Sequence, residues 1–152
     1  MARRLRIGFF LLLVTVSTHI SSQSNEMIDA ILTEEVATVG SAAYVALAAG
    51  GLIDDDASPE RAVTVAGEAG WLPEGVDANS PASFGQIAYL LMQSSEVSGG
   101  LMYRLIPGPR YAAREFVFRG WSPERRTPGE RVSGQFLVRV TGNFLDNTEV
   151  SR

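Results

Sequence analysis

Apolar residues recur every three or four positions along much of the chain, which is the spacing of one face of an α-helix. The clearest stripes lie in residues 25–32, 58–69 and 83–92. Each stripe begins at or next to a serine whose side chain can accept a hydrogen bond from the first helical turn: Ser24, Ser58 and Ser83. Gln86 completes a capping box with the last of these serines. The pattern therefore predicts three helices with defined starts.

Shorter stretches between these stripes are also expected to be helical, and glycine or proline marks their ends. They are residues 42–49, 101–106 and 109–119, and a last segment that begins after Ser133. Alternation with a period of two occurs in two short segments, residues 115–118 and 136–140. Neither is long enough to indicate a sheet, so we expect an all-α fold.

The helical segments form an internal repeat of about 50 residues. The corresponding positions are Ala43-Tyr44 with Ala88-Tyr89, Gly51-Leu52 with Gly100-Leu101, Pro59 with Pro109, and Gly70-Trp71 with Gly120-Trp121. A third, truncated copy begins at Val132. We expect about five or six short helices in two and a half helix-loop-helix repeats, packed as one bundle because neither helix of a unit can bury its apolar stripe alone. Trp71 and Trp121 are expected to cover the junctions between units.

The first 24 residues have the order of a secretory signal peptide. Three arginines lie within residues 1–6, an apolar run follows at residues 7–16, and residues 17–24 are small and polar. The run has about 10 residues against the roughly 20 that span a bilayer, so an uncleaved anchor is the weaker interpretation. The chain has no cysteine. We predict a signal peptide over residues 1–24, a single domain over residues 25–152, and export to a bacterial periplasm or cell envelope.

Removing the predicted leader leaves an acidic chain without lysine or histidine. Ten arginines remain against seventeen acids, a formal net charge of −7. Nucleic-acid binding requires clustered positive charge, and docking on an anionic membrane surface does too. We therefore expect neither partner, and no stable membrane span after cleavage. An envelope protein or a cell-wall glycan stays possible as a partner.

Polar and aromatic side chains are densest in residues 103–115, which we take as the candidate binding site. The six residues are Tyr103, Arg104, Arg110, Tyr111, Arg114 and Glu115. Arginines suit carboxylate or phosphate groups, and tyrosines can stack on a sugar or a peptide. The structural alternative is that Glu115 pairs with Arg119 one helical turn later and that the arginine stems cover the core. The alternative is favoured because structural ion-pair networks are common.

Two further stretches have a functional and a structural interpretation. The apolar residues around Tyr103, at positions 101–106, form either an exposed strip for a partner or, as we expect, part of the core. The acidic run at residues 54–56 lacks the central glycine and final glutamate of a calcium-binding EF-hand loop. We expect a solvated loop that precedes a helix.

The repeat resembles S-layer homology (SLH) modules, in which helix-loop-helix units pack as a three-fold bundle. The shared features are helices that open at Ser83 and Ser133, an apolar stripe after each, and a second helix ended by glycine. The residues after Ser83 are Phe-Gly-Gln-Ile, where that family has Thr-Arg-Ala-Glu, so the resemblance implies no binding of cell-wall polymer. Residues 99–115 and 132–137 are also similar to a family of uncharacterised exported spirochaete proteins. That likeness implies an envelope location and no activity.

The residue types that are absent limit the possible enzyme chemistry. Without histidine, cysteine or lysine after residue 24, the chain lacks the usual catalytic triads, thiol nucleophiles, Schiff bases and zinc sites. We expect no cofactor and no metal. The leading hypothesis is a non-catalytic exported binding or scaffolding module of the envelope. The alternatives are a peptidoglycan-acting glycosidase or lytic enzyme that uses Glu115 as its acid, and a subunit of a larger periplasmic assembly.

Overall fold

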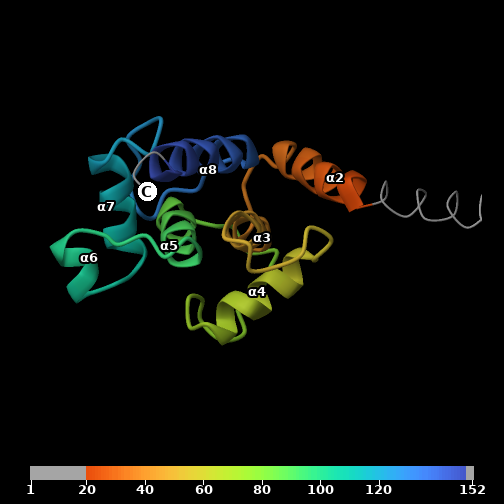
Figure 1. Cartoon of the computed structure of the whole chain (residues 1–152), viewed down its shortest axis with the longest axis horizontal. Coiled ribbons are helices and arrows are strands. Elements are labelled where there is room, and N and C mark those ends of the chain that lie inside the picture. The colour runs from red at the N-terminus through yellow and green to blue at the C-terminus, as the bar shows by residue number, and fades with distance from the viewer. Residues whose placement is uncertain (1–19, 150–152) are drawn as a thin grey trace, which may run out of the picture.

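The computed structural model describes residues 20–149, and this part of the chain is all-α, as the apolar spacing predicts. It contains seven helices, against the five or six expected. They are α2 (Ile20–Leu32), α3 (Val39–Ala49), α4 (Pro59–Glu68), α5 (Phe84–Ser94), α6 (Leu101–Leu105), α7 (Pro109–Phe118) and α8 (Gly134–Glu149). The helices form one bundle (Figure 1), with α6 and α7 at one end and α2 at the other.

Side-chain caps define the starts of four helices. Three of them start where the sequence indicates, whereas α3 begins at Val39 and not at the expected residue 42. Thr38 and Ser58 accept hydrogen bonds from the first turns of α3 and α4, and Ser83 forms the predicted capping box with Gln86 at α5. The Ser133 hydroxyl accepts a hydrogen bond from the backbone N–H of Phe136 in α8 at 3.2 Å. The proposed cap at Ser24 is wrong, because α2 already includes Ile20.

The two glycine-tryptophan pairs end α4 and α7 in the same way. Gly70 and Gly120 have positive φ angles of 76° and 72°, which glycine adopts at little cost. The following tryptophan N–H groups donate to carbonyl oxygens inside the preceding helices, Trp71 to Ala66 and Trp121 to Phe116. These bonds satisfy carbonyl groups that a helix end leaves open.

Aromatic side chains connect α5, α7 and α8 in the core. Phe116 stacks on Phe144 with ring centroids 5.1 Å apart, and Trp121 meets both rings edge-on. Phe84 at the start of α5 contacts Phe116 on one side and Phe136 on the other. Trp121 therefore packs between α7 and α8, whereas Trp71 is only partly buried against the core.

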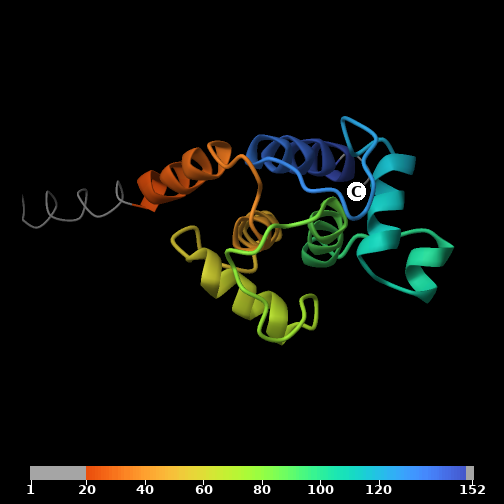
Figure 2. The same ribbon diagram turned by 180° about the vertical axis from the view of Figure 1, so that it is seen from behind.

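Three segments that lead into helices are hydrogen-bonded to one another. The N–H of Ala37, before α3, donates to the carbonyl of Val132, before α8, at 2.7 Å. The N–H of Ala82, before α5, donates to the Ala37 carbonyl at 2.8 Å. Helices α3, α5 and α8 therefore start from a common centre, and α4 lies on the side of α3 and α5 away from α8 (Figure 2). The number of repeats stays a prediction.

The two short alternating segments are helical, since residues 115–118 lie in α7 and residues 136–140 in α8. Within residues 20–149, no helix combines the length and the apolar character needed to cross a membrane. The predicted signal peptide lies outside the described residues except for residues 20–24, which belong to α2.

Candidate binding surface at α6 and α7

Helix α6 is attached to the body of the protein through Tyr103. The side chain is 5% exposed, and its ring meets Tyr89 of α5 edge-on at 6.3 Å. The amide of Gln93, also on α5, donates a hydrogen bond to the Tyr103 hydroxyl oxygen at 2.8 Å. Burial raises the pKa of Tyr103 to about 12, against a partial opposing effect of that hydrogen bond. The neutral phenol therefore holds α6 in place.

The glycine pair before α6 makes room for two neighbouring side chains. A Cβ atom at Gly99 would lie 2.5 Å from the Tyr103 ring, and a Cβ at Gly100 would lie 2.7 Å from a carboxylate oxygen of Glu115 on α7. Both distances are well below van der Waals contact. Gly99 therefore leaves room for the Tyr103 ring, and Gly100 leaves room for the Glu115 carboxylate beside the five-residue helix α6.

The other large side chains of this segment face the solvent. Leu101, Met102, Leu105 and Ile106 are 70%, 56%, 67% and 59% exposed. The expectation that they belong to the core is wrong, because a helix of little more than one turn can turn only one side inward, and Tyr103 occupies that side. These four residues are called the apolar face of α6 below.

Helix α7 is fixed by a buried side formed by Ala112, Ala113 and Phe116. Its N-terminus lies close to α5 because position 85 is a glycine, where a Cβ would lie 2.8 Å from the Pro109 carbonyl oxygen. The opposite side of α7 carries exposed Arg114 and Phe118, and Phe118 is 87% exposed. Phe118 and the α6 residue Met102 line a common hollow.

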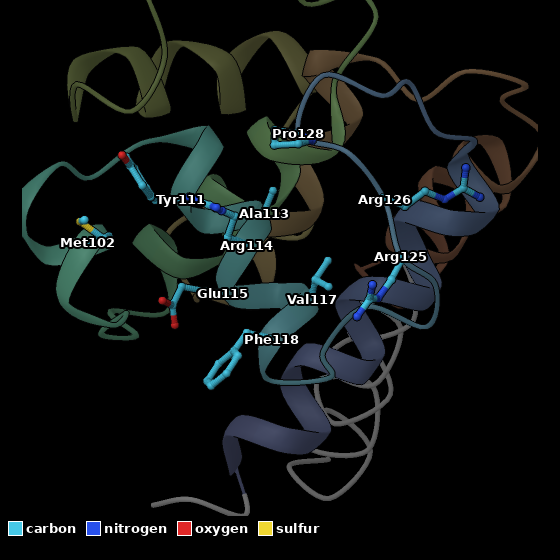
Figure 3. Close-up of a pocket in the computed structure, with 10 residues that line it drawn as sticks. All are labelled: Met102, Tyr111, Ala113, Arg114, Glu115, Val117, Phe118, Arg125, Arg126 and Pro128. Atoms are coloured by element: carbon cyan, nitrogen blue, oxygen red, sulfur yellow. The ribbon is translucent and has the colours of Figure 1, made fainter.

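A hollow of about 760 Å³ lies beside α7, and residues from α6, α7 and the following loop line it (Figure 3). The lining residues are Met102, Tyr111, Ala113, Arg114, Glu115, Val117, Phe118, Arg125, Arg126 and Pro128. Figure 3 shows Glu115 and Phe118 pointing outward from α7, with Arg125 reaching in from the loop that follows. Together, α6, α7 and this hollow are called the α6–α7 surface.

The structure brings three of the six predicted site residues to this hollow: Tyr111, Arg114 and Glu115. Arg104 and Arg110 are exposed but do not line it, and the buried Tyr103 supports α6. The predicted pairing of Glu115 with Arg119 is present, with Nε and Oε2 3.1 Å apart. Glu115 thus has a structural role, as the alternative interpretation proposed.

Sequence reasoning missed Phe118 and Arg125. Positions 111, 114, 115 and 118 share one face of a helix, so the helical spacing already aligned Phe118 with the predicted cluster. Arg125 carries no comparable signal, because its position depends on how the loop after α7 folds back.

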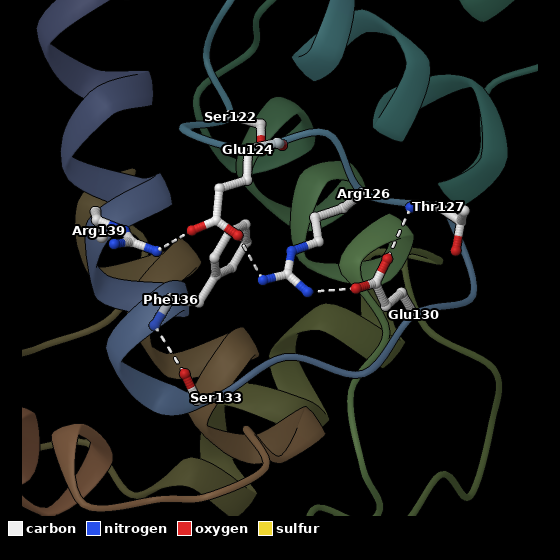
Figure 4. Close-up of polar contacts among 8 residues, drawn as sticks. All are labelled: Ser122, Glu124, Arg126, Thr127, Glu130, Ser133, Phe136 and Arg139. Atoms are coloured by element: carbon white, nitrogen blue, oxygen red, sulfur yellow. Dashed lines mark hydrogen bonds and ion pairs between the residues drawn. The ribbon is translucent and has the colours of Figure 1, made fainter.

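Two neighbouring arginines in that loop differ in role, and Figure 4 shows the partners of one of them, Arg126. Arg126 pairs with Glu130 and with Glu124, and its guanidinium lies 5.0 Å from the centre of the Phe136 ring. The Arg126 hydrogen bond lowers the pKa of Glu130 below its ordinary value. Arg125 makes no ion pair or hydrogen bond within residues 20–149. Arg126 fixes the loop, and Arg125 is available for a ligand.

Charge is divided unevenly along the described chain. Residues 25–100 contain twelve acids and one arginine, whereas residues 101–126 contain six arginines and two acids. The net charge of the whole chain therefore does not describe the α6–α7 surface, which is basic. Net charge alone therefore does not exclude the binding of an anionic group at this surface.

Two other kinds of site, a glycosidase site and a metal site, need acidic side chains placed close together. Among the described residues that line the hollow, Glu115 is the single acid, whereas glycoside hydrolysis usually needs two. The acidic run at residues 54–56 is an exposed loop before α4, as expected. Within residues 20–149, acidic side chains form no group that could hold a metal ion.

No protein-family model, curated protein or solved structure matches the chain. The likeness to SLH modules and to exported spirochaete proteins therefore stays a prediction.

Proposed function

We propose that this protein is a non-catalytic, exported binding or scaffolding module of the cell envelope, and that it contacts its partner through the α6–α7 surface. The observation that carries the proposal is the exposure of the apolar face of α6 together with Phe118. Contiguous apolar residues on a protein surface commonly mark interaction sites.

The charges around this apolar patch indicate what the partner offers. Arg104, Arg110, Arg114 and Arg125 make no ion pair within residues 20–149. Guanidinium groups bind carboxylates through paired hydrogen bonds, and a surface that combines exposed apolar residues with unpaired arginines suits a partner with complementary charge. The expected partner surface is therefore apolar at its centre and acidic at its rim.

The proposal assigns no chemistry to Glu115, whose carboxylate is paired with Arg119. It includes the case in which the partner belongs to a larger periplasmic assembly. In both cases the contact buries the same residues, so one experiment addresses both.

Site-specific photocrosslinking in intact cells tests the proposal. A photoreactive phenylalanine analogue replaces Phe118, and in a matched variant it replaces Val36, an exposed apolar residue between α2 and α3. We expect a discrete crosslinked product from position 118 and none from position 36, because only the first lies on the α6–α7 surface. Absence of any product at position 118, in cells where the protein is exported and folded, would contradict the proposal.

A further inference from the structure

The acidic part of the molecule contains a hollow suited to the apolar face of α6. About 350 Å³ in volume, it lies between α2, α3 and α8 and is lined mainly by Ile28, Val45, Ala48 and Val138, with Asp55 among its lining residues. A neighbouring hollow of about 400 Å³ shares Asp55 and adds further acids and Met27. The two are called the acidic hollows below.

The carboxylates beside these hollows are available for a partner. Asp54, Asp55 and Asp56 are exposed and make no ion pair within residues 20–149. The Tyr44 hydroxyl donates to the backbone carbonyl of Asp55 at 2.9 Å, which positions the loop without using its carboxylates. Negative charge beside the hollow is therefore fixed in place and unneutralised.

The two complementary surfaces lie at different ends of the molecule. Figures 1 and 2 show α6 and α7 at one end and α2 with the loop before α4 toward the other. One end offers exposed leucine, methionine and isoleucine side chains with unpaired arginines. The other offers an apolar hollow with unpaired aspartates.

We propose that the partner of the α6–α7 surface is a second copy of this chain, which receives the apolar face of α6 in its acidic hollows. The inference rests on the proposed function, since it uses the same surface and names its occupant. The leucine and isoleucine side chains of one copy enter the apolar hollow of the next. Arg104, Arg110 and Arg114 then face Asp54, Asp55 and Asp56 across the contact.

This contact is head-to-tail, because the two surfaces that meet are different. Such a contact generates either a ring or an open filament, according to whether the rotation between copies closes. In a filament, every interior copy uses both of its surfaces, and each terminal copy leaves one surface free. In a ring, every copy uses both. Assembly therefore grows with protein concentration and weakens with salt, since charged rims are screened.

Two variants separate the ends of the contact. The tip variant is Leu101→Ser/Leu105→Ser/Ile106→Ser, which changes exposed residues only. The hollow variant is Asp55→Arg/Asp56→Arg, which turns the exposed acidic rim basic and keeps the backbone carbonyl that Tyr44 uses. A matched control, Glu68→Arg/Glu74→Arg, makes the same charge change at exposed positions at the end of α4 and in the loop after it. All forms keep residues 1–24, so any difference between them arises from the substituted residues.

Sedimentation equilibrium of the purified full chain, from about 10 µM to about 1 mM, measures the assembly. We expect the mean mass of the wild type and of the control to rise with concentration, and each end variant to stay monomeric. An equimolar mixture of the tip and hollow variants is expected to form a dimer and nothing larger. The hollow variant keeps the apolar face of α6, the tip variant keeps the acidic hollows, and only this one contact can form. Raising the salt concentration about tenfold is expected to weaken that dimer.

Three results would overturn the inference: a monomeric wild type over this range, a hollow variant that associates as the wild type does, or a mixture that stays monomeric. The second would indicate a symmetric contact between two tips. A monomeric wild type combined with a photocrosslink from position 118 to another protein would overturn the inference and leave the proposed function standing.

Discussion

The connection between α3 and α4 and the connection between α5 and α7 join helix pairs that end alike, yet they differ in chemistry. Residues 50–58 carry three consecutive aspartates, and Leu52 is their one strongly exposed large apolar residue. Residues 95–108 contain α6, with four exposed apolar residues and Arg104. Each connection is held by one buried tyrosine. Tyr44 of α3 donates to the Asp55 carbonyl of the first connection, and Tyr103 of the second accepts from Gln93 of α5.

The difference shows which features folding requires. A connection between two packed helices needs turn residues and one tether, and residues 50–58 form a folded connection with little more than that. The apolar face of α6 therefore exceeds what the fold demands of such a segment. Surplus apolar exposure in one of two comparable connections is a stronger indication of a binding role than exposure considered alone.

The largest effect expected from this comparison is a difference between the two tryptophans. Trp121 is buried against Phe116 and Phe144, so Trp121→Ala is expected to lower the free energy of unfolding by about 3–5 kcal/mol. Trp71 is only partly buried, and Trp71→Ala is expected to cost about 1–2 kcal/mol. Urea unfolding followed by circular dichroism measures both. Equal losses would show that the two halves are packed alike.

The tyrosine tethers predict a smaller effect that depends on pH. Because the pKa of Tyr103 is raised to about 12, the folded protein retains a proton that the unfolded chain begins to release near pH 10. Its contribution to stability is complete below about pH 10 and is lost as the pH rises through about 12. We expect a loss on the order of 1 kcal/mol at about pH 11.

Urea unfolding at about pH 8 and about pH 11, compared between wild type and Tyr103→Phe, isolates this contribution. The variant lacks the ionisable group, so its stability should fall less between the two pH values. The pKa of Tyr44 is also raised, mainly by burial and further by Asp55 and Asp56. Both proteins contain Tyr44, so the comparison between them leaves only the contribution of Tyr103. An equal fall in the two proteins would show that Tyr103 ionises as freely when folded as when unfolded.

The smallest expected effect concerns the exposed apolar residues themselves. Leu105→Ser in α6 and Leu52→Ser in the other connection should each change the free energy of unfolding by less than about 0.5 kcal/mol, because both side chains lie largely in solvent. Thermal unfolding of the two variants measures this directly. A loss several times larger for Leu105→Ser would mean that α6 contributes to the core, and the comparison of the two connections would fail.

The fold was predictable from local signals, since capping residues, glycine ends and apolar spacing all act over a few positions. Ser58 and Ser83 start helices as their spacing to later residues indicates, and Gly120 ends α7 where the pattern stops. The start of α2 was not predictable from Ser24, because upstream residues that can also form a helix made a cap there unnecessary.

The candidate site was predictable only in part, since it depends on which side of a short helix faces inward. Tyr103 was grouped with the arginines because they are neighbours in sequence, but the hydrogen bond from Gln93 takes it into the interior. With Tyr103 inside, the residues around it are forced outward. That outcome depends on α5, which lies outside the segment itself, so the spacing of residues 101–106 alone cannot determine it.

The hydrogen bond between Ala37 and Val132 has a consequence for the order in which the chain can fold. It joins segments about 95 residues apart, so the common centre from which α3, α5 and α8 start is completed only when the last quarter of the chain is present. Synthesis delivers that quarter last. A chain that ended before Val132 would contain α3 and α5 but would lack the hydrogen bond that joins the segment before α3 to the segment before α8.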